Sequence, residues 1–146
     1  MKIFLGSDHA GFVLKSKIID YLKSKNFEVE DKGAFNLDLN DDYPDFIRPV
    51  AEAVSKDPEA RGIVLGRSGV GEAILANRFP NVRAVSWYGC DFSIIKLSRE
   101  HNNANVLSLG ARSISLNQAI EAVELWLATP FSGDERHVRR IAKLEL

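Results

Sequence analysis

The sequence has little that would support a disulfide, a cysteine-based metal centre or a membrane span. Cys90 is the only cysteine in 146 residues, so neither an internal disulfide nor a zinc site of paired cysteines is expected. We expect Cys90 to be an ordinary small apolar residue, because free cysteines are commonly buried. No apolar run approaches the roughly 20 residues of a membrane helix. Asp8 and His9 interrupt an apolar start that is too short for a signal-peptide core. We therefore expect a cytoplasmic protein with no membrane partner.

An excess of either charge is also missing. Lys and Arg number 19 and Asp and Glu number 20, which gives a formal net charge of -1. This balance indicates neither nucleic acid nor an anionic membrane as a partner. A strong anion site must therefore come from a local basic cluster. The length and a hydrophobic fraction of 45% predict one domain, residues 1–146, with a single core.

Short apolar runs alternate with helical patterns along the whole chain. The runs are apolar on consecutive residues, as expected for strands covered on both faces of a parallel sheet. The order predicts a doubly wound α/β domain with three layers, a five-stranded parallel sheet and right-handed crossovers. The expected strands are residues 2–7, 28–31, 62–65, 83–87 and 105–109. The expected helices are residues 12–25, 45–55, 71–79, 90–100, 116–128 and 134–144.

Three segments with unusual chemistry are expected to open onto one edge of this sheet, because ligands of such folds bind beyond the carboxyl ends of the strands. The first is residues 7–11, where Asp8 and His9 place a carboxylate and an imidazole between a strand and a helix. Histidine suits proton transfer and phosphate contact near neutral pH. The alternative is that Asp8 caps the helix and His9 is incidental.

The second segment is the glycine-rich stretch Gly66-Arg67-Ser68-Gly69-Val70-Gly71-Glu72. Its glycines allow backbone N–H groups to face an anion, and the following helix adds its positive end. It lacks the Gly-Lys-Ser/Thr ending of a P-loop, and Ile74 stands where the dinucleotide motif needs a glycine. The stretch is either an oxyanion-stabilising loop or a plain tight turn. Glu72 is either a carboxylate base beside that loop or a residue that compensates the helix dipole.

The third segment, residues 98–105, is dense in polar residues where a helix meets a strand. His101 is either a proton donor and acceptor at the mouth of the site or a cation at a helix C-terminus. A basic cluster lies further on, and guanidinium forks within it suit a phosphate dianion. The other interpretation of that cluster is a solvated charged face. Its members are Arg112, Arg136, His137, Arg139 and Arg140, and Arg136 and Arg140 lie one helical turn apart.

In these segments the chain resembles ribose-5-phosphate isomerase type B and its relatives, the galactose-6-phosphate and allose-6-phosphate isomerases. The resemblance runs along nearly the whole chain and depends on five motifs in order and at similar spacing. They are Ser7-Asp8-His9-Ala10-Gly11, Asp42-Tyr43-Pro44-Asp45, Gly66 to Glu72 with Ala76-Asn77, Ser98 to Leu107, and Arg136-His137 with Arg140.

The resemblance implies a Rossmann-like homodimer that binds a phosphorylated sugar, needs no metal or cofactor, and forms its active site between subunits. Whether dimers pair into tetramers stays open. The loop that stabilises the reacting oxygen would use the backbone of Gly66, Ser68, Gly69, Val70 and Gly71. One chain would supply Asp8, His9, Tyr43, Ser68, Glu72, His101 and Asn102. The partner would bring Arg136, His137 and Arg140 to the phosphate, with His9 and Arg112 nearby.

The base is the point at which this sequence departs from many relatives. Many carry a cysteine where Gly66 stands, and that thiolate removes the proton from the sugar. The chain resembles instead the mycobacterial branch, in which a glutamate at the Glu72 position is the base. Residues 133–137 also differ from the form common in the cysteine branch, which leaves the sugar less defined than the reaction type.

The resulting hypothesis is an aldose–ketose isomerase that interconverts ribose 5-phosphate and ribulose 5-phosphate. His101, aided by Asp8, would open the ring, and Glu72 would move a proton from C2 to C1 through a cis-enediolate. Two alternatives stay open: an isomerase of a six-carbon aldose 6-phosphate of the allose or galactose type, and a sugar-phosphate-binding domain without turnover. Loop 33–42 is the segment expected to set the sugar length.

Overall fold

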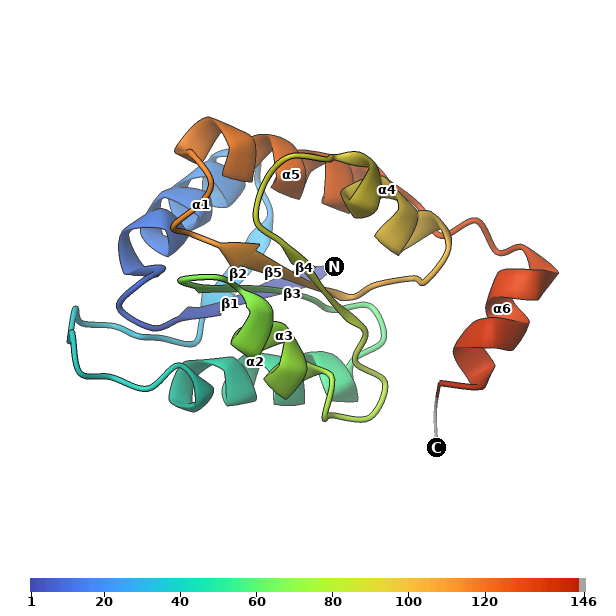
Figure 1. The fold of residues 1–146 in the computed structure, drawn as a ribbon, viewed down its shortest axis with the longest axis horizontal. Coiled ribbons are helices and arrows are strands. Elements are labelled where there is room, and N and C mark those ends of the chain that lie inside the picture. The colour runs from blue at the N-terminus through green and yellow to red at the C-terminus, as the bar shows by residue number, and fades with distance from the viewer. Residues whose placement is uncertain (145–146) are drawn as a thin grey trace.

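The computed structural model describes residues 1–144 and shows a parallel sheet between two layers of helices (Figure 1). The sheet has the strand order β2-β1-β3-β5-β4, and each neighbouring pair is parallel. This arrangement confirms the predicted three-layer, Rossmann-like α/β fold. The strands are β1 (Lys2–Ser7), β2 (Glu28–Asp31), β3 (Arg61–Gly66), β4 (Ala84–Trp87) and β5 (Val106–Gly110).

The helices cover both faces of the sheet. In Figure 1, α1, α4 and α5 lie on one face and α2 and α3 on the other, while α6 stands apart at one end. None of the helices within residues 1–144 is long and apolar enough to cross a membrane. Their bounds are α1 (Phe12–Ser24), α2 (Pro44–Lys56), α3 (Val70–Ala76), α4 (Ser93–Glu100), α5 (Leu116–Ala128) and α6 (Glu135–Ala142).

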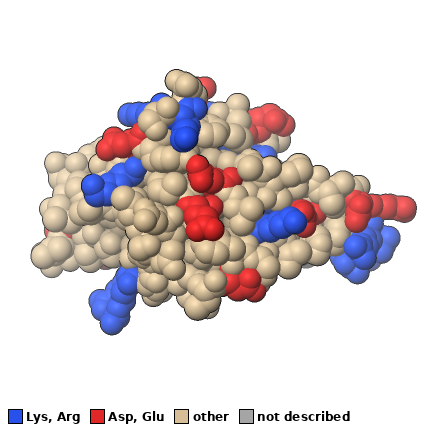
Figure 2. Space-filling view, turned by 90° about the horizontal axis from the view of Figure 1, so that it is seen from above, with Lys and Arg blue, Asp and Glu red and all other residues tan. Residues whose placement is uncertain are grey.

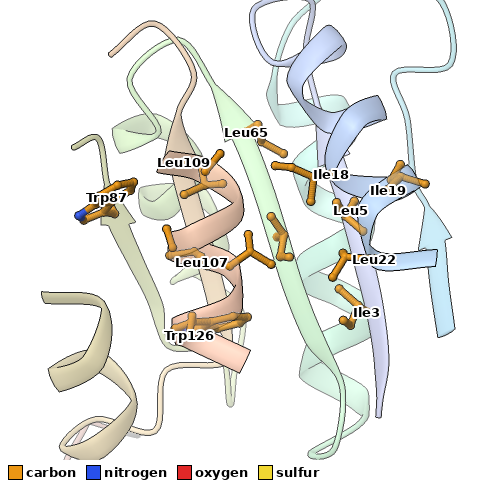
Figure 3. Close-up of a cluster of buried hydrophobic side chains, with 14 of the residues drawn as sticks. Ile3, Leu5, Ile18, Ile19, Leu22, Leu65, Trp87, Leu107, Leu109 and Trp126 are labelled. Atoms are coloured by element: carbon orange, nitrogen blue, oxygen red, sulfur yellow. The ribbon is translucent and has the colours of Figure 1, made fainter. Parts of the chain in front are cut away.

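The strands are apolar on consecutive residues because each face of the sheet has its own core. On β1, Ile3 and Leu5 pack with α1 and α5, whereas Phe4 packs with α2. Figure 3 shows the first of these cores, where Trp126 of α5 lies near Leu107 of β5. Full burial of each such side chain stabilises the fold by about 1.5–3 kcal/mol.

Two helices differ from the prediction by three residues at one end, and local polar bonds explain both. α3 ends at Ala76 because the Asn77 side chain turns to bond both backbone groups of Ala84. α4 begins at Ser93, where the backbone N–H bonds to the Asp91 carboxylate. Cys90 therefore lies in a loop, with a positive φ of 73°, and it is exposed. The expectation of a buried Cys90 was wrong.

Charges of both signs are mixed on the face of the molecule that Figure 2 shows. On the face formed by α1, α4 and α5, Lys and Arg are interspersed with Asp and Glu, and no area of one sign dominates (Figure 2). At the end where α6 lies, basic and acidic side chains occur together. The surface agrees with the balanced composition and leaves anion binding to particular clusters.

Candidate active site

Three loops meet at the carboxyl edge of the sheet. The strand register sets Ser7 beside Leu65 and Gly66 beside Gly110. Backbone N–H groups of the loop after β5 bond the loop after β3, from Ala111 to Gly66 O at 2.9 Å and from Arg112 to Arg67 O at 3.1 Å. The loops thus enclose a cavity of about 450 Å³ whose lining is Asp8, His9, Ala10, Arg67, Ala111 and Arg112. The first two predicted segments and Arg112 do share an edge.

Glu72 is a buried carboxylate in the first turn of α3, with only 3% of the residue exposed. It lies against Gly66, and a Cβ at position 66 would overlap the Glu72 carboxylate. Burial raises the pKa of Glu72, and the Asp8 charge adds to the rise, against a hydrogen bond from the Glu72 backbone that lowers it. Burial therefore affects the pKa of Glu72 more than the backbone N–H at the start of α3 does. A raised pKa brings a carboxylate closer to the basicity that proton transfer near neutral pH needs.

The glycine-rich loop is held by hydrogen bonds from two serines, the buried Ser108 and the half-buried Ser86. Gly69 has a φ of 76°, a left-handed conformation that suits glycine. The Gly69 carbonyl accepts hydrogen bonds from Ser108 Oγ at 2.6 Å and Ser86 Oγ at 3.0 Å. Ser68 Oγ in turn accepts from the Val70 N–H at 3.3 Å. No sequence motif marks Ser86 and Ser108, because both lie inside apolar strands.

Tyr43 reaches the same loop from the start of α2. A Cβ at Gly71 would lie 2.8 Å from Tyr43 Oη, so the small residue at position 71 leaves room for the phenol. Tyr43 stands at the N-cap of α2, after the polar loop that the sequence places between β2 and α2. The structure thus brings Tyr43, Ser68 and Glu72 into one neighbourhood. We call the residues at this end the carboxyl-edge group: Asp8, His9, Tyr43, Gly66, Ser68, Gly69, Val70, Gly71, Glu72 and Arg112.

Asp8 and His9 both have defined partners. Asp8 is 8% exposed, and its Oδ1 accepts from the Ala10 N–H at 3.0 Å, in the turn before α1. The N-cap of α1 is Gly11 and has no side-chain cap bond, so the alternative in which Asp8 caps the helix is wrong. Its Oδ2 lies 4.0 Å from His9 Nδ1. His9 Nδ1 lies 2.5 Å from Asp41 Oδ1, which also accepts the His9 backbone N–H at 3.1 Å. The hydrogen bond to Asp41 is the main cause of a raised pKa of His9.

Asp41 is a site residue that the sequence did not reveal. It follows His9 by 32 positions and stands in a polar loop with Asp38 and Asp42, where nothing local distinguishes it. Within residues 1–144, donor atoms of Asp8, His9 and Asp41 form one group compact enough to hold a metal ion. The 2.5 Å between His9 and Asp41 is a hydrogen-bond distance, whereas two ligands of one ion lie about 3 Å apart. The contact is that of a hydrogen-bonded pair.

The third predicted segment lies at the opposite edge of the sheet, contrary to expectation. Residues 98–105 precede β5, and the Gly62 N–H at the start of β3 donates to Asn105 O at 2.9 Å. Gly62 and Gly66 are four positions apart along β3, which is roughly 13 Å of extended chain. His101 and Asn102 therefore cannot stand beside Glu72 of their own chain. The prediction was wrong because residues 98–105 lead into β5, whereas the other two segments follow the carboxyl ends of β1 and β3.

His101 packs against α6 instead. Its ring stacks on His137, with centroids 4.3 Å apart and planes at 15°. His137 is only 5% exposed, and its Nε2 is buried without a hydrogen-bond partner within residues 1–144. Burial lowers the pKa of His137, and the charges of His101, Arg136 and Arg140 lower it further, against a smaller opposite effect of Asp134. Figure 1 places α6 at the end of the molecule away from the loop that joins β2 and α2.

The two arginines expected on one helical face do lie on α6 and are exposed. Arg136 Nη2 is 3.7 Å from Asp134 Oδ2. Arg99, by contrast, is buried and structural: its guanidinium bonds the Thr129 and Ala104 carbonyls, and burial lowers its pKa to about 10. We call the second set the amino-edge group: His101, Asn102, Arg136, His137 and Arg140.

Comparison with known proteins agrees with this geometry. The sequence profile of the Ribose/Galactose Isomerase family matches residues 3–144. Ribose-5-phosphate isomerase B of Mycolicibacterium paratuberculosis is 44% identical over 142 residues, which cover 97% of this chain and 87% of the relative. Its Escherichia coli counterpart is 39% identical over 141 residues, covering 96% and 91%. The structure of ribose-5-phosphate isomerase B from Mycoplasma genitalium with bound ribulose-5-phosphate matches with a TM-score of 0.93 at 40% identity, over 98% of this chain and 93% of that one.

Fold, site and relatives together define the class of protein, an isomerase built on a Rossmann-like domain. Because both the profile and relatives above 30% identity span nearly the whole chain, the family follows directly. The chain belongs to the Ribose/Galactose Isomerase family.

Proposed function

We propose that the protein interconverts ribose 5-phosphate and ribulose 5-phosphate. The observation that carries the proposal is the buried Glu72 carboxylate, which lies against Gly66. Arg67, the residue after Gly66, lines a cavity together with His9 and Arg112. A carboxylate of raised pKa suits removal of a proton from a sugar, and the cationic side chains of the cavity suit its phosphate. The names of full-length relatives at about 40% identity support the same reaction.

The proposed active site is composite and is built from two copies of the chain. Each copy carries a carboxyl-edge group and an amino-edge group at opposite ends of its sheet, so neither end alone holds both Glu72 and His101. A homodimer that sets the amino-edge group of one subunit over the carboxyl-edge group of the other would complete two identical sites. A twofold dimer is the commonest way in which equal chains assemble. We place this enzyme in the cytoplasm.

The proposed reaction divides between the two groups. His101 of the partner subunit, with Asp8 of this one, moves the protons that open the sugar ring. Glu72 then removes the C2 proton and returns it to C1, through a cis-enediolate. Backbone N–H groups of residues 68–71 stabilise the negative oxygen, because the first N–H groups of a helix lack intrahelical partners. No metal or cofactor enters this scheme.

Phosphate binding would supply the energy that orients the reacting carbons. His9 and Arg112 lie on the cavity of this chain, and Arg136, His137 and Arg140 of the partner subunit would close over it. Arg67, which the sequence analysis treated only as part of the loop, lines the same cavity and is exposed. We include its guanidinium among the phosphate ligands.

Mixed dimers test both the reaction and the composite site. Glu72→Gln chains and His101→Ala chains, each inactive alone, are unfolded together, refolded and assayed with ribose 5-phosphate and with allose 6-phosphate. In a composite site one of the two sites of each mixed dimer receives both wild-type residues, so activity returns. If both residues acted within one chain, every site would lack one of them. Mixed dimers without turnover would refute the composite site, and a parent enzyme that acts only on the six-carbon sugar would refute the proposed substrate.

A further inference from the structure

The His9 imidazole is held from one side by a carboxylate that belongs to another loop. Asp41 Oδ1 lies 2.5 Å from His9 Nδ1 and also accepts the His9 backbone N–H at 3.1 Å. The Asp41 side chain is 8% exposed, while the His9 side chain is 32% exposed. One carboxylate oxygen therefore fixes both the backbone and the ring of His9, and the ring keeps an open face.

The loop that carries Asp41 is firmly attached to the body of the domain at its start. The Ala34 N–H donates to Ser7 O at 2.7 Å, and the Ser7 N–H donates to Gly33 O at 2.8 Å. The buried Lys15 ammonium donates to Ala34 O at 2.8 Å and to Asp31 Oδ1 at 2.6 Å. The loop thus starts from a fixed point next to β1. It brings Asp41 back to the residue that follows Asp8.

The hydrogen bond at Nδ1 leaves Nε2 as the ring nitrogen of His9 that is available to a ligand. His9 lines the cavity of about 450 Å³ together with Arg67 and Arg112. A hydrogen bond from one ring nitrogen to a carboxylate sets the orientation and proton arrangement of the whole imidazole. A ring that donates from both nitrogens binds Asp41 on one side and an anion on the other.

We propose that Asp41 is a positioning residue of the active site, which orients His9 so that Nε2–H donates to the phosphate of the substrate. The identity of that ligand rests on the proposed function, but the orientation of His9 does not. Asp41 does not touch the sugar phosphate and acts only through the ring it holds. The loop between β2 and α2 thereby takes part in phosphate binding.

Electrostatics support the same role. The hydrogen bond to Asp41 raises the pKa of His9, and the charges of Asp8, Asp41 and Asp38 add to the rise, against desolvation, which lowers it. The guanidinium groups of Arg67 and Arg112 face the same cavity and oppose protonation of the ring. The cationic ring is present below the raised pKa and is lost as the pH rises through it. Phosphate binding should therefore weaken with rising pH, and Asp41 should set the pH at which it does.

The test compares Asp41→Asn with Asp38→Asn, a matched control. Asp38 is an exposed residue of the same loop, and its Oδ1 accepts only from the Asn40 N–H at 2.9 Å among the contacts of residues 1–144. Ring ¹⁵N NMR of the three histidines, with His9 assigned through His9→Gln, gives the proton arrangement and pKa of His9. Kinetics with ribose 5-phosphate, and competition by inorganic phosphate, give the pH profile of KM.

Asp41→Asn should lower the pKa of His9 and raise KM by about tenfold at neutral pH, the usual consequence of losing a charge-assisted hydrogen bond. The change in kcat should be smaller, and the rise of KM with pH should begin at a lower pH. Asp38→Asn removes only the smallest of the charge effects on the pKa of His9 and leaves the bond from His9 to Asp41 intact, so KM should change little. An unaltered His9 spectrum, or a rise in KM that is independent of pH, would overturn the proposal. An inactive parent enzyme would instead refute the proposed substrate, while NMR titration with inorganic phosphate would still decide the role of Asp41.

Discussion

Replacing Glu72 with glutamine should separate substrate binding from turnover. Glutamine keeps the shape of the side chain in a site that is nearly closed, since Glu72 is 3% exposed and lies against Gly66. It cannot accept the substrate proton as a carboxylate does. Turnover should fall by at least the ~10²–10⁴-fold typical of a lost general base. Binding of ribose 5-phosphate should persist, because the phosphate ligands are untouched.

The same substitution should not destabilise the fold near neutral pH. Burial raises the pKa of Glu72 above its ordinary value of 4.5. For a carboxyl whose pKa is raised by folding, ionisation favours the unfolded chain, so stability is lost as pH rises from 4.5 through the raised pKa. Glutamine removes this loss. The free energy of unfolding of Glu72→Gln, relative to the parent, should therefore increase with pH across that interval and stay level above it.

Three measurements check these expectations, with Glu121→Gln on the exposed face of α5 as the matched control. They are steady-state turnover, exchange of the C2 hydrogen with solvent deuterium, and denaturant unfolding at several pH values. Turnover and exchange should fall together in Glu72→Gln and remain normal in the control. If Glu72→Gln keeps near-normal exchange, Glu72 is a helix-end residue and another group is the base.

Three further expectations follow from the same edge of the sheet. Gly66→Ala should reduce kcat by roughly 10²-fold or more, because its Cβ displaces the Glu72 carboxylate; normal kcat would show that the two do not compete for space. Arg67→Gln should raise KM by about three- to tenfold with little change in kcat, since an exposed guanidinium contributes on the order of 1 kcal/mol; unchanged KM at low salt would remove Arg67 from the phosphate site. Activity should survive exhaustive chelation, because His9 and Asp41 form a hydrogen-bonded pair; a loss that one divalent metal restores would contradict this.

The strands could be predicted well from the sequence because most of them are buried on both faces and are therefore apolar on consecutive residues. Residues 2–7 and 28–31 agree with the structure, and the other strands differ by one residue at one end or at both ends. The ends of the helices were harder to predict, because they depend on hydrogen bonds of single side chains. The Asn77 amide ends α3 and the Asp91 carboxylate sets the start of α4, and neither bond leaves a periodic signal.

The candidate site was predictable only where function follows a strand directly. Asp8, His9 and the Gly66–Glu72 loop are close in sequence to strand ends, so topology alone brings them together. Asp41 escaped notice because its role depends on a contact 32 residues away. His101 was predicted at the wrong edge because residues 98–105 follow α4 and lead into β5. They therefore lie at the amino end of a strand, whereas the prediction assumed a carboxyl end.

The placement of the two groups at opposite edges of the sheet determines how specific activity depends on protein concentration. The carboxyl-edge group and the amino-edge group of one chain are roughly 13 Å apart along the strands of the sheet, so they cannot contact each other within that chain. In the proposed homodimer, each encounter of two chains would create two catalytic centres at once, and each dissociation would abolish both. Specific activity would then decline on dilution below the dissociation constant and rise when substrate bridges the two halves, because a ligand held by both subunits opposes their separation.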